Sequence, residues 1–171
     1  RENQYLAVSR FIEEKGSAFY RLAEQNNLEG IVAKRKNSKY RPATRTKDWV
    51  KIKFLQDDDF VVCGYIRKSD IISSIVLGQY RGSELVYIGH VTLGVSGDDL
   101  RIIQNHKTIN SPPMPVPKGH GNENAVWLSP DLVCVVRYMM KTDSGSLRQP
   151  VFKGLRYDKS PLECKATGNF L

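Results

Sequence analysis

Three short segments carry side chains that could handle phosphate. The first runs from Glu29 to Lys34 and separates a carboxylate from an ammonium group by a glycine and three apolar residues. The second holds Lys51 and Lys53, which a strand would project from one face because its side chains alternate. The third, residues 148–159, has two arginines and two lysines against one acid. Guanidinium forks match phosphate oxygens in pairs, so these segments together could bind and orient a polyphosphate.

Each segment also has a plainer interpretation. A glutamate that opens a strand is commonly solvated, alternating lysines are common on exposed sheet edges, and residues 148–159 could form a solvated basic strand. The glycine after Glu29 could allow a ligand to approach the backbone closely.

The charge distribution favours a polyanionic partner. The chain has 171 residues and a net charge of +8. The window from Lys34 to Lys53 contains nine basic residues and one acid, so it carries the whole excess. A solvated basic face is the alternative, but Tyr40 and Trp49 lie among the charges, as in structured chain. Such a block is suited to contact phosphates and to release their counterions.

Composition excludes several classes of protein. The cysteines are Cys63, Cys134 and Cys164, which are too far apart for a zinc ribbon and odd in number. This usage indicates a reducing compartment. The three histidines are equally scattered, and no apolar run approaches the roughly 18 residues of a membrane helix. The sequence therefore predicts no structural metal and no membrane span, and the start at Arg1 without a leader suggests part of a longer protein.

The first 55 residues are predicted to be mixed helix and strand. Phe19, Leu22 and Ala23 have helical spacing and predict a helix over 17–25. The apolar run after Gly30 predicts a largely buried strand within 28–36, and alternation predicts a second strand over 48–54.

An acidic run at 56–59 is interpreted as a hinge or linker, and a domain boundary is placed there. Beyond it, Ser96 and Asp99 form a capping-box-like start for a helix that extends to about residue 107. A proline-rich loop covers 110–124. The predicted strands are 60–66, 71–81, 84–93, 125–128 and 132–140. Five strands with a helix between the third and fourth are typical of an OB-type barrel, and another antiparallel barrel is the alternative.

The three segments, in this order, resemble motifs IV, V and VI of the ATP-dependent DNA ligases in the covalent nucleotidyltransferase superfamily. The string from Leu28 to Pro42, the Lys47–Lys53 segment and Leu147–Arg156 look most like bacterial and archaeal non-homologous end-joining ligases. The resemblance covers roughly residues 16–161. It implies a mixed α/β fragment of a nucleotidyltransferase (adenylation) domain in 1–55, an all-β OB-fold barrel with one helix in 56–165, and a tail in 166–171.

The resemblance also implies roles for individual residues. Glu29 would help to hold a divalent cation, Mg²⁺ or Mn²⁺. Lys51 and Lys53 would neutralise the α-phosphate of ATP, with Lys34 in the same pocket. The third segment would bind the β- and γ-phosphates of ATP and orient the leaving pyrophosphate. Its residues in this role would be Arg148, Arg156 and Lys159, with Asp158. Trp49 is expected to be core packing beside the pocket rather than a base-stacking residue. The basic window supplies the expected DNA contacts: Arg35, Lys36, Lys39, Arg41, Arg45 and Lys47.

The implied reaction is the sealing of nicks or broken ends in duplex DNA through enzyme–AMP and DNA-adenylate intermediates. The expected setting is the nucleoid in a prokaryotic cytoplasm, as a monomer, with a Ku-type end-binding protein as a partner.

Three features depart from the family pattern. The Lys-x-Asp-Gly nucleophile motif is absent, so the chain is expected to be a C-terminal portion that cannot adenylylate itself. Ala43 stands where the family usually has glycine after Arg41-Pro42, and Tyr157 where the subgroup often has glutamate. Two alternatives remain open: a noncatalytic OB-type nucleic-acid-binding module, and a relative among the mRNA capping enzymes or RNA ligases.

Overall fold

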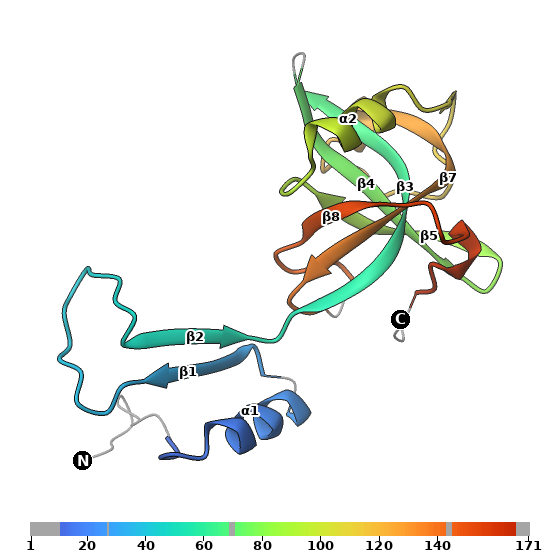
Figure 1. Cartoon of the computed structure of the whole chain (residues 1–171). Helices are drawn as coiled ribbons and strands as arrows, with labels where there is room; N and C mark the ends of the chain where they lie inside the picture. Colours follow the sequence, from blue (N-terminus) through green and yellow to red (C-terminus); the bar gives the residue numbers. More distant parts are fainter. Residues whose placement is uncertain (1–10, 27, 69–70, 143–144, 167–171) are drawn as a thin grey trace. The chain divides into compact units, whose positions relative to one another are not determined.

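The computed structural model describes residues 11–26, 28–68, 71–142 and 145–166. It divides the chain into two compact units, one that ends at Phe54 and one that begins at Leu55 (Figure 1). Five of the six residues of the expected tail, 167–171, lie outside the described residues. Within the described ranges, the helices are too short or too polar to span a membrane.

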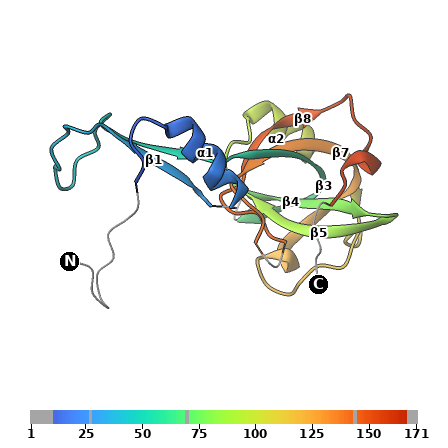
Figure 2. The ribbon, with the colours of Figure 1, turned by 90° about the horizontal axis from the view of Figure 1, so that it is seen from below.

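The first unit is a helix and a two-stranded hairpin. Helix α1 (Gly16–Gln25) precedes strands β1 (Gly30–Lys34) and β2 (Trp49–Lys53), which pair in antiparallel fashion. The helix packs against β1 (Figures 1 and 2). Its Tyr20 ring lies 4.5 Å from the Phe54 ring, between centroids. The predicted helix and both predicted strands are therefore confirmed, with slightly shorter strands.

The prediction that the first strand is largely buried is wrong. Val32, in the middle of β1, is 48% exposed. It lies opposite Lys51 in the hairpin, and opposed residues share one face of a sheet. Val32 is therefore on the lysine face, where nothing described in this unit covers it.

The second unit is an antiparallel sheet with helix α2 (Gly97–Gln104) and two short 3-10 helices, η1 (Asn122–Asn124) and η2 (Pro161–Glu163). Its strands are β3 (Gln56–Lys68), β4 (Ile71–Arg81), β5 (Glu84–Val91), β6 (Thr108–Ile109), β7 (Ala125–Tyr138) and β8 (Val151–Arg156). They are ordered β5-β4-β3-β7-β6, and β8 also pairs with β7.

Strand β3 is central and buried on both faces. Phe60 and Val62 belong to one apolar cluster, and Val61 and Cys63 belong to another. A register shift between Val62 and Gly64 marks a bulge, after which Tyr65 joins the cluster of Phe60 and Val62. The strands curve around this core (Figure 2). A strand buried on both faces explains why the sequence shows an unbroken apolar run here.

The expected barrel is confirmed only as a curved, predominantly antiparallel sheet. Among the described residues, no ladder joins β5 to β8 and closes the sheet. The approach nearest to closure is a single parallel bridge between Leu93 and Val151, where the Phe152 amide donates to the Leu93 carbonyl at 2.8 Å. One bridge in place of a ladder leaves the barrel open.

The acidic run at 56–59 is part of a strand. The expectation of a linker is wrong, because Gln56 to Asp59 pair with Tyr138 to Val135 as the start of β3. The two strands expected over 125–140 form one strand, β7. The predicted cap is confirmed, since the Asp99 amide donates to the Ser96 hydroxyl at 3.1 Å.

Candidate phosphate-binding and nucleic-acid sites

A row of lysines lies along one face of the β1–β2 hairpin. The register places Lys34 opposite Trp49, Val32 opposite Lys51 and Gly30 opposite Lys53. Alternation along β2 puts Trp49, Lys51 and Lys53 on the same side, so Lys34 joins them there. The Lys34 ammonium lies 4.1 Å from the centroid of the Trp49 ring, which agrees with that placement. The hairpin therefore brings three ammonium groups from two sequence segments to one exposed face.

The glycine of the first segment is required by the neighbouring strand. A Cβ on Gly30 would lie 2.2 Å from the Ile52 carbonyl oxygen and 2.8 Å from the Lys53 Cα. Its φ of +149° is also one that side-chain-bearing residues rarely adopt. The structure therefore gives this glycine a different role from admitting a ligand: it lets β1 pack closely on β2, opposite Lys53.

The loop between the two strands encloses a basic pocket of about 530 Å³. Trp49 forms part of its wall and is 40% exposed; its indole N–H donates to the Ser38 hydroxyl at 3.0 Å. The Tyr40 ring is tilted against it at 5.7 Å. The expectation that Trp49 is core packing is therefore wrong: the side chain forms an exposed part of the pocket wall. The lining residues are Lys39, Tyr40, Arg41, Ala43, Thr44, Arg45, Thr46, Trp49 and Lys51.

The expected DNA contacts fall into two groups. Lys39, Arg41 and Arg45 line the pocket, and Lys47 is exposed nearby in the loop sequence. Arg35 and Lys36 instead have acidic partners, Asp48 at 3.1 Å and Glu13 at 2.8 Å. These ion pairs are exposed and therefore weak, so a phosphate could replace them at little cost.

Ala43 adopts a left-handed backbone conformation, with φ of +56°. The family pattern has glycine at this position. Alanine therefore keeps the glycine-like conformation of the loop, and its Cβ adds local strain.

Glu29 lies immediately before β1, and its carbonyl accepts the Phe54 amide at 3.2 Å. Among the described residues there is no cluster of three or more His, Cys, Asp or Glu side chains that could hold a metal ion. Mg²⁺ is commonly held by one or two carboxylates together with substrate phosphates, so a single carboxylate such as Glu29 suits that ion.

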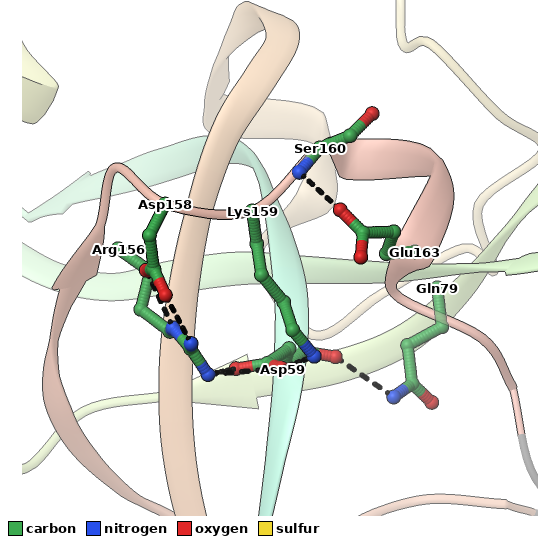
Figure 3. Close-up of polar contacts among 7 residues, drawn as sticks. All are labelled: Asp59, Gln79, Arg156, Asp158, Lys159, Ser160 and Glu163. Atoms are coloured by element: carbon green, nitrogen blue, oxygen red, sulfur yellow. Dashed lines mark hydrogen bonds and ion pairs between the residues drawn. The ribbon is translucent and has the colours of Figure 1, made fainter.

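The third segment forms a charge cluster with the acidic run of β3 (Figure 3). The Arg156 guanidinium contacts both oxygens of Asp59 at 3.2 and 3.3 Å through Nη1. Its Nε and Nη2 donate to Asp158 at 3.0 and 2.5 Å. The Lys159 ammonium donates to Asp59 at 2.6 Å. The structure therefore brings Arg156 and Lys159 together around one carboxylate.

These contacts shift the ionisation of the cluster. Hydrogen bonding to Arg156 lowers the pKa of Asp158 to about 2. The hydrogen bonds that Arg156 donates to the carboxylates of Asp158 and Asp59 raise the pKa of Arg156, and the bond that Lys159 donates to Asp59 raises the pKa of Lys159. These shifts favour the charged forms of Arg156, Lys159 and Asp158 near neutral pH.

The third predicted ligand, Arg148, lies before β8. Its backbone pairs with the segment after β7. The Arg148 amide donates to the Met140 carbonyl at 3.0 Å, and the Met139 amide donates to the Arg148 carbonyl at 3.0 Å. Arg148, Arg156 and Lys159 belong to the second unit, whereas Glu29, Lys34, Lys51 and Lys53 belong to the first.

Sequence reasoning missed the basic partners of the acidic run at the start of β3. Each aspartate of the run has a basic partner: Asp57 binds Arg137 in bidentate fashion at 2.8 and 2.6 Å, and Asp58 lies 3.6 Å from the Lys141 ammonium. The available signal was the absence of any glycine or proline between the run and the apolar strand that follows it.

Comparison with known protein families finds two matching models in sequence order. Residues 9–53 match the ATP dependent DNA ligase domain, and residues 68–159 match the ATP dependent DNA ligase C terminal region.

Individual relatives agree with these matches. The chain is 34% identical over 146 residues to the multifunctional non-homologous end joining protein LigD of Pseudomonas aeruginosa, covering 80% of this chain and 17% of that protein. It resembles the crystal structure of the ligase domain of M. tuberculosis LigD with a TM-score of 0.60 and 28% identity, covering 87% of this chain and 51% of that one. A mycobacterial DNA ligase D complexed with ATP has a TM-score of 0.58 and 29% identity, with 89% and 51% covered. The chain thus spans about half of these ligase domains and less than a fifth of the full-length relative.

Proposed function

The chain belongs to the ATP-dependent DNA ligase family, and from this premise we propose that it works within a longer enzyme that joins nicked or broken duplex DNA. In this proposal ATP first transfers AMP to the enzyme, AMP then passes to a DNA 5′-phosphate, and the 3′-hydroxyl displaces it. The observation that carries the proposal is the face on which Lys34, Lys51 and Lys53 gather.

The lysine face suits the reacting phosphate. Three ammonium groups on neighbouring strands can stabilise the charge that develops on the α-phosphate, and preorganised groups of this kind are worth several kcal/mol in comparable sites. Glu29 would take part in holding a divalent cation, which would spread the phosphate charge when bound. Trp49 keeps Lys34 in place through their cation–π contact.

The second unit supplies the groups for the departing pyrophosphate. Arg156 and Lys159 lie together at the end of β8, and Arg148 precedes the same strand. Guanidinium and ammonium groups suit the β- and γ-phosphates, which are needed only in the first step. We assign residues 1–55 to the adenylation domain and 56–165 to the OB-fold domain with the third segment.

The basic loop of the hairpin is assigned to DNA. Lys39, Arg41 and Arg45 project around its pocket, and contacts between such side chains and phosphates give affinity that falls steeply with salt. A Ku-type end-binding partner is part of the proposal, since the P. aeruginosa relative is described as a non-homologous end joining protein.

The proposal is tested on the longest native protein that contains this chain. Its mass should rise by one AMP after incubation with ATP and Mg²⁺, while the 171-residue chain, which lacks a Lys-x-Asp-Gly nucleophile, should not change. A gain of GMP from GTP would instead indicate a capping enzyme. No gain from either nucleotide would favour a noncatalytic binding module.

A matched pair of lysine variants locates the chemistry. Lys53→Ala should suppress both AMP uptake and sealing, because this residue lies in the lysine row. Lys47 lies in the loop assigned to DNA. Lys47→Ala should therefore leave AMP uptake unchanged and should reduce the rate of sealing, because one phosphate contact is lost. Equal effects of the two variants on AMP uptake would contradict the assigned division of roles.

A further inference from the structure

One carboxylate of the second unit holds both cations assigned to the departing pyrophosphate. Asp59 accepts from the Lys159 ammonium at 2.6 Å and from the Arg156 guanidinium at 3.2 and 3.3 Å (Figure 3). It comes from β3, about 100 residues earlier in the chain, so nothing local in the sequence enforces these contacts.

Asp59 is fixed in place from several directions. Its residue pairs with Val135 of β7, and its carbonyl accepts the side-chain amide of Gln79 at 3.0 Å. Gln79 is fully buried in β4. The Asp59 side chain is only 13% exposed. Its carboxylate therefore has little freedom to move away from its partners.

The second carboxylate of the cluster is different. Asp158 lies in the turn after β8, and its side chain is 68% exposed. It covers the Nε and Nη2 edge of Arg156, which is the edge that a phosphate would engage with two hydrogen bonds. With two cations and two carboxylates the cluster is neutral as it stands. A polyphosphate that engages this edge of Arg156 would displace Asp158, whose 68% exposed side chain leaves at lower cost than the 13% exposed side chain of Asp59.

The contacts of Asp59 leave donors available. Lys159 has three N–H groups and donates one of them to Asp59. Arg156 has five N–H groups, and only those on Nη1 contact Asp59. The turn is also held beyond Lys159, since the Ser160 amide donates to the Glu163 carboxylate at 2.8 Å. Asp59 thus holds two cations beside one carboxylate and leaves some of their N–H groups unused.

We propose that Asp59 is a positioning residue, which holds Arg156 and Lys159 in the arrangement that receives the β- and γ-phosphates of ATP. This inference rests on the proposed ligase function and adds to it a residue outside the three segments. It requires Asp59 to matter for AMP transfer from ATP and not for the final joining step, in which no pyrophosphate is present.

The test uses the full-length protein with Asp59→Asn, which keeps the shape of the side chain and removes its charge. Single-turnover AMP uptake should slow about tenfold or more, with a higher KM for ATP, because small displacements of positioned groups are costly. Sealing of a nick that already carries AMP should stay within about twofold of the unmodified protein. Unchanged or faster AMP uptake would overturn the inference, since Asp59 would then be passive or would compete with ATP for the cations.

Two further variants separate position from charge and from folding. Asp57→Asn is the matched control on the same face of β3; Asp57 binds Arg137 outside the cluster, and both steps should be unchanged. Asp59→Glu keeps the charge but moves it by one methylene, so it should also slow AMP uptake. If Asp59→Asn fails to fold, Asp59→Glu decides: AMP uptake at the rate of the unmodified protein would refute positioning.

The unmodified protein separates the two hypotheses. If it takes up no AMP at all, the proposed function fails and the inference fails with it. If it takes up AMP, and Asp59→Asn does so equally well, only the positioning role fails.

Discussion

Replacing Gly30 by alanine is expected to break the pairing of β1 with β2 and so to disperse the lysine face. The added Cβ would lie 2.2 Å from the Ile52 carbonyl oxygen, about 1 Å closer than an ordinary carbon–oxygen contact of roughly 3.3 Å. The second close atom, the Lys53 Cα at 2.8 Å, is also backbone, so no side-chain rotation can relieve the overlap.

Two costs add. A side-chain-bearing residue at a φ of +149° costs about 1–3 kcal/mol, and the steric overlap costs about 1–3 kcal/mol more. A two-stranded hairpin is marginal by itself, and within the described part of the first unit only Ala23 is buried among the apolar residues. The expected loss of about 2–6 kcal/mol is therefore enough to separate the strands.

Amide hydrogen exchange followed by mass spectrometry can read the two units of the 171-residue chain separately. Peptides from β1 and β2 should exchange at least about 30-fold faster in Gly30→Ala, the change that about 2 kcal/mol produces. Peptides from β3 and β7 should keep their protection, because those strands belong to the other unit.

Gly16→Ala is the control within the same unit. A Cβ at Gly16, the first residue of α1, meets no atom within 4 Å, and alanine favours a helix, so protection should be unchanged or slightly higher. Unchanged protection of β1 and β2 in Gly30→Ala would refute the close approach of the strands and the reason given for this glycine.

Other substitutions and titrations test separate features. Ala43→Gly should stabilise the hairpin by about 0.5–1 kcal/mol, since relief of the left-handed conformation at φ +56° outweighs the greater freedom of glycine when unfolded; slower exchange of β2 would show it, and faster exchange would contradict it. The carboxyl ¹³C shift of Asp158 should titrate near pH 2 rather than 3.8, because its pKa is lowered by Arg156. The resulting stabilisation is fully present above pH 3.8 and is lost as the pH falls through about 2; a midpoint near 3.8 would exclude the ion pair. Cys164 should resist alkylation at pH 8, because it is 1% exposed and burial raises its pKa to about 11, leaving about one thiolate in a thousand; labelling as fast as a free thiol would show that the site opens.

Patterns of neighbouring residues predicted the strands and helix caps well where contacts close in the sequence determine the structure. The strand 71–81 was placed at both ends as the structure has it, and the cap at Ser96 follows from its spacing to Asp99. Patterns failed where a distant partner decides. The acidic run at 56–59 was expected to be a hinge or linker, but it begins β3, and its cationic partners come from β7, β8 and the turn that follows β8. The continuity of β7 across Ser129 and Pro130 was missed for the same reason.

The sequence by itself determined the chemistry that is present: the basic window, the alternation that aligns Lys51 with Lys53, and three segments whose order indicates the ligase family. These are local properties, since alternation and charge density depend on neighbouring residues. Only the tertiary structure decided the strand register that puts Lys34 beside Trp49, that Gly30 packs against the adjacent strand, and that Asp59 holds Arg156 and Lys159. Each of these depends on strand register or on contacts between segments far apart in the chain, where the free energy of burial and pairing selects the partner.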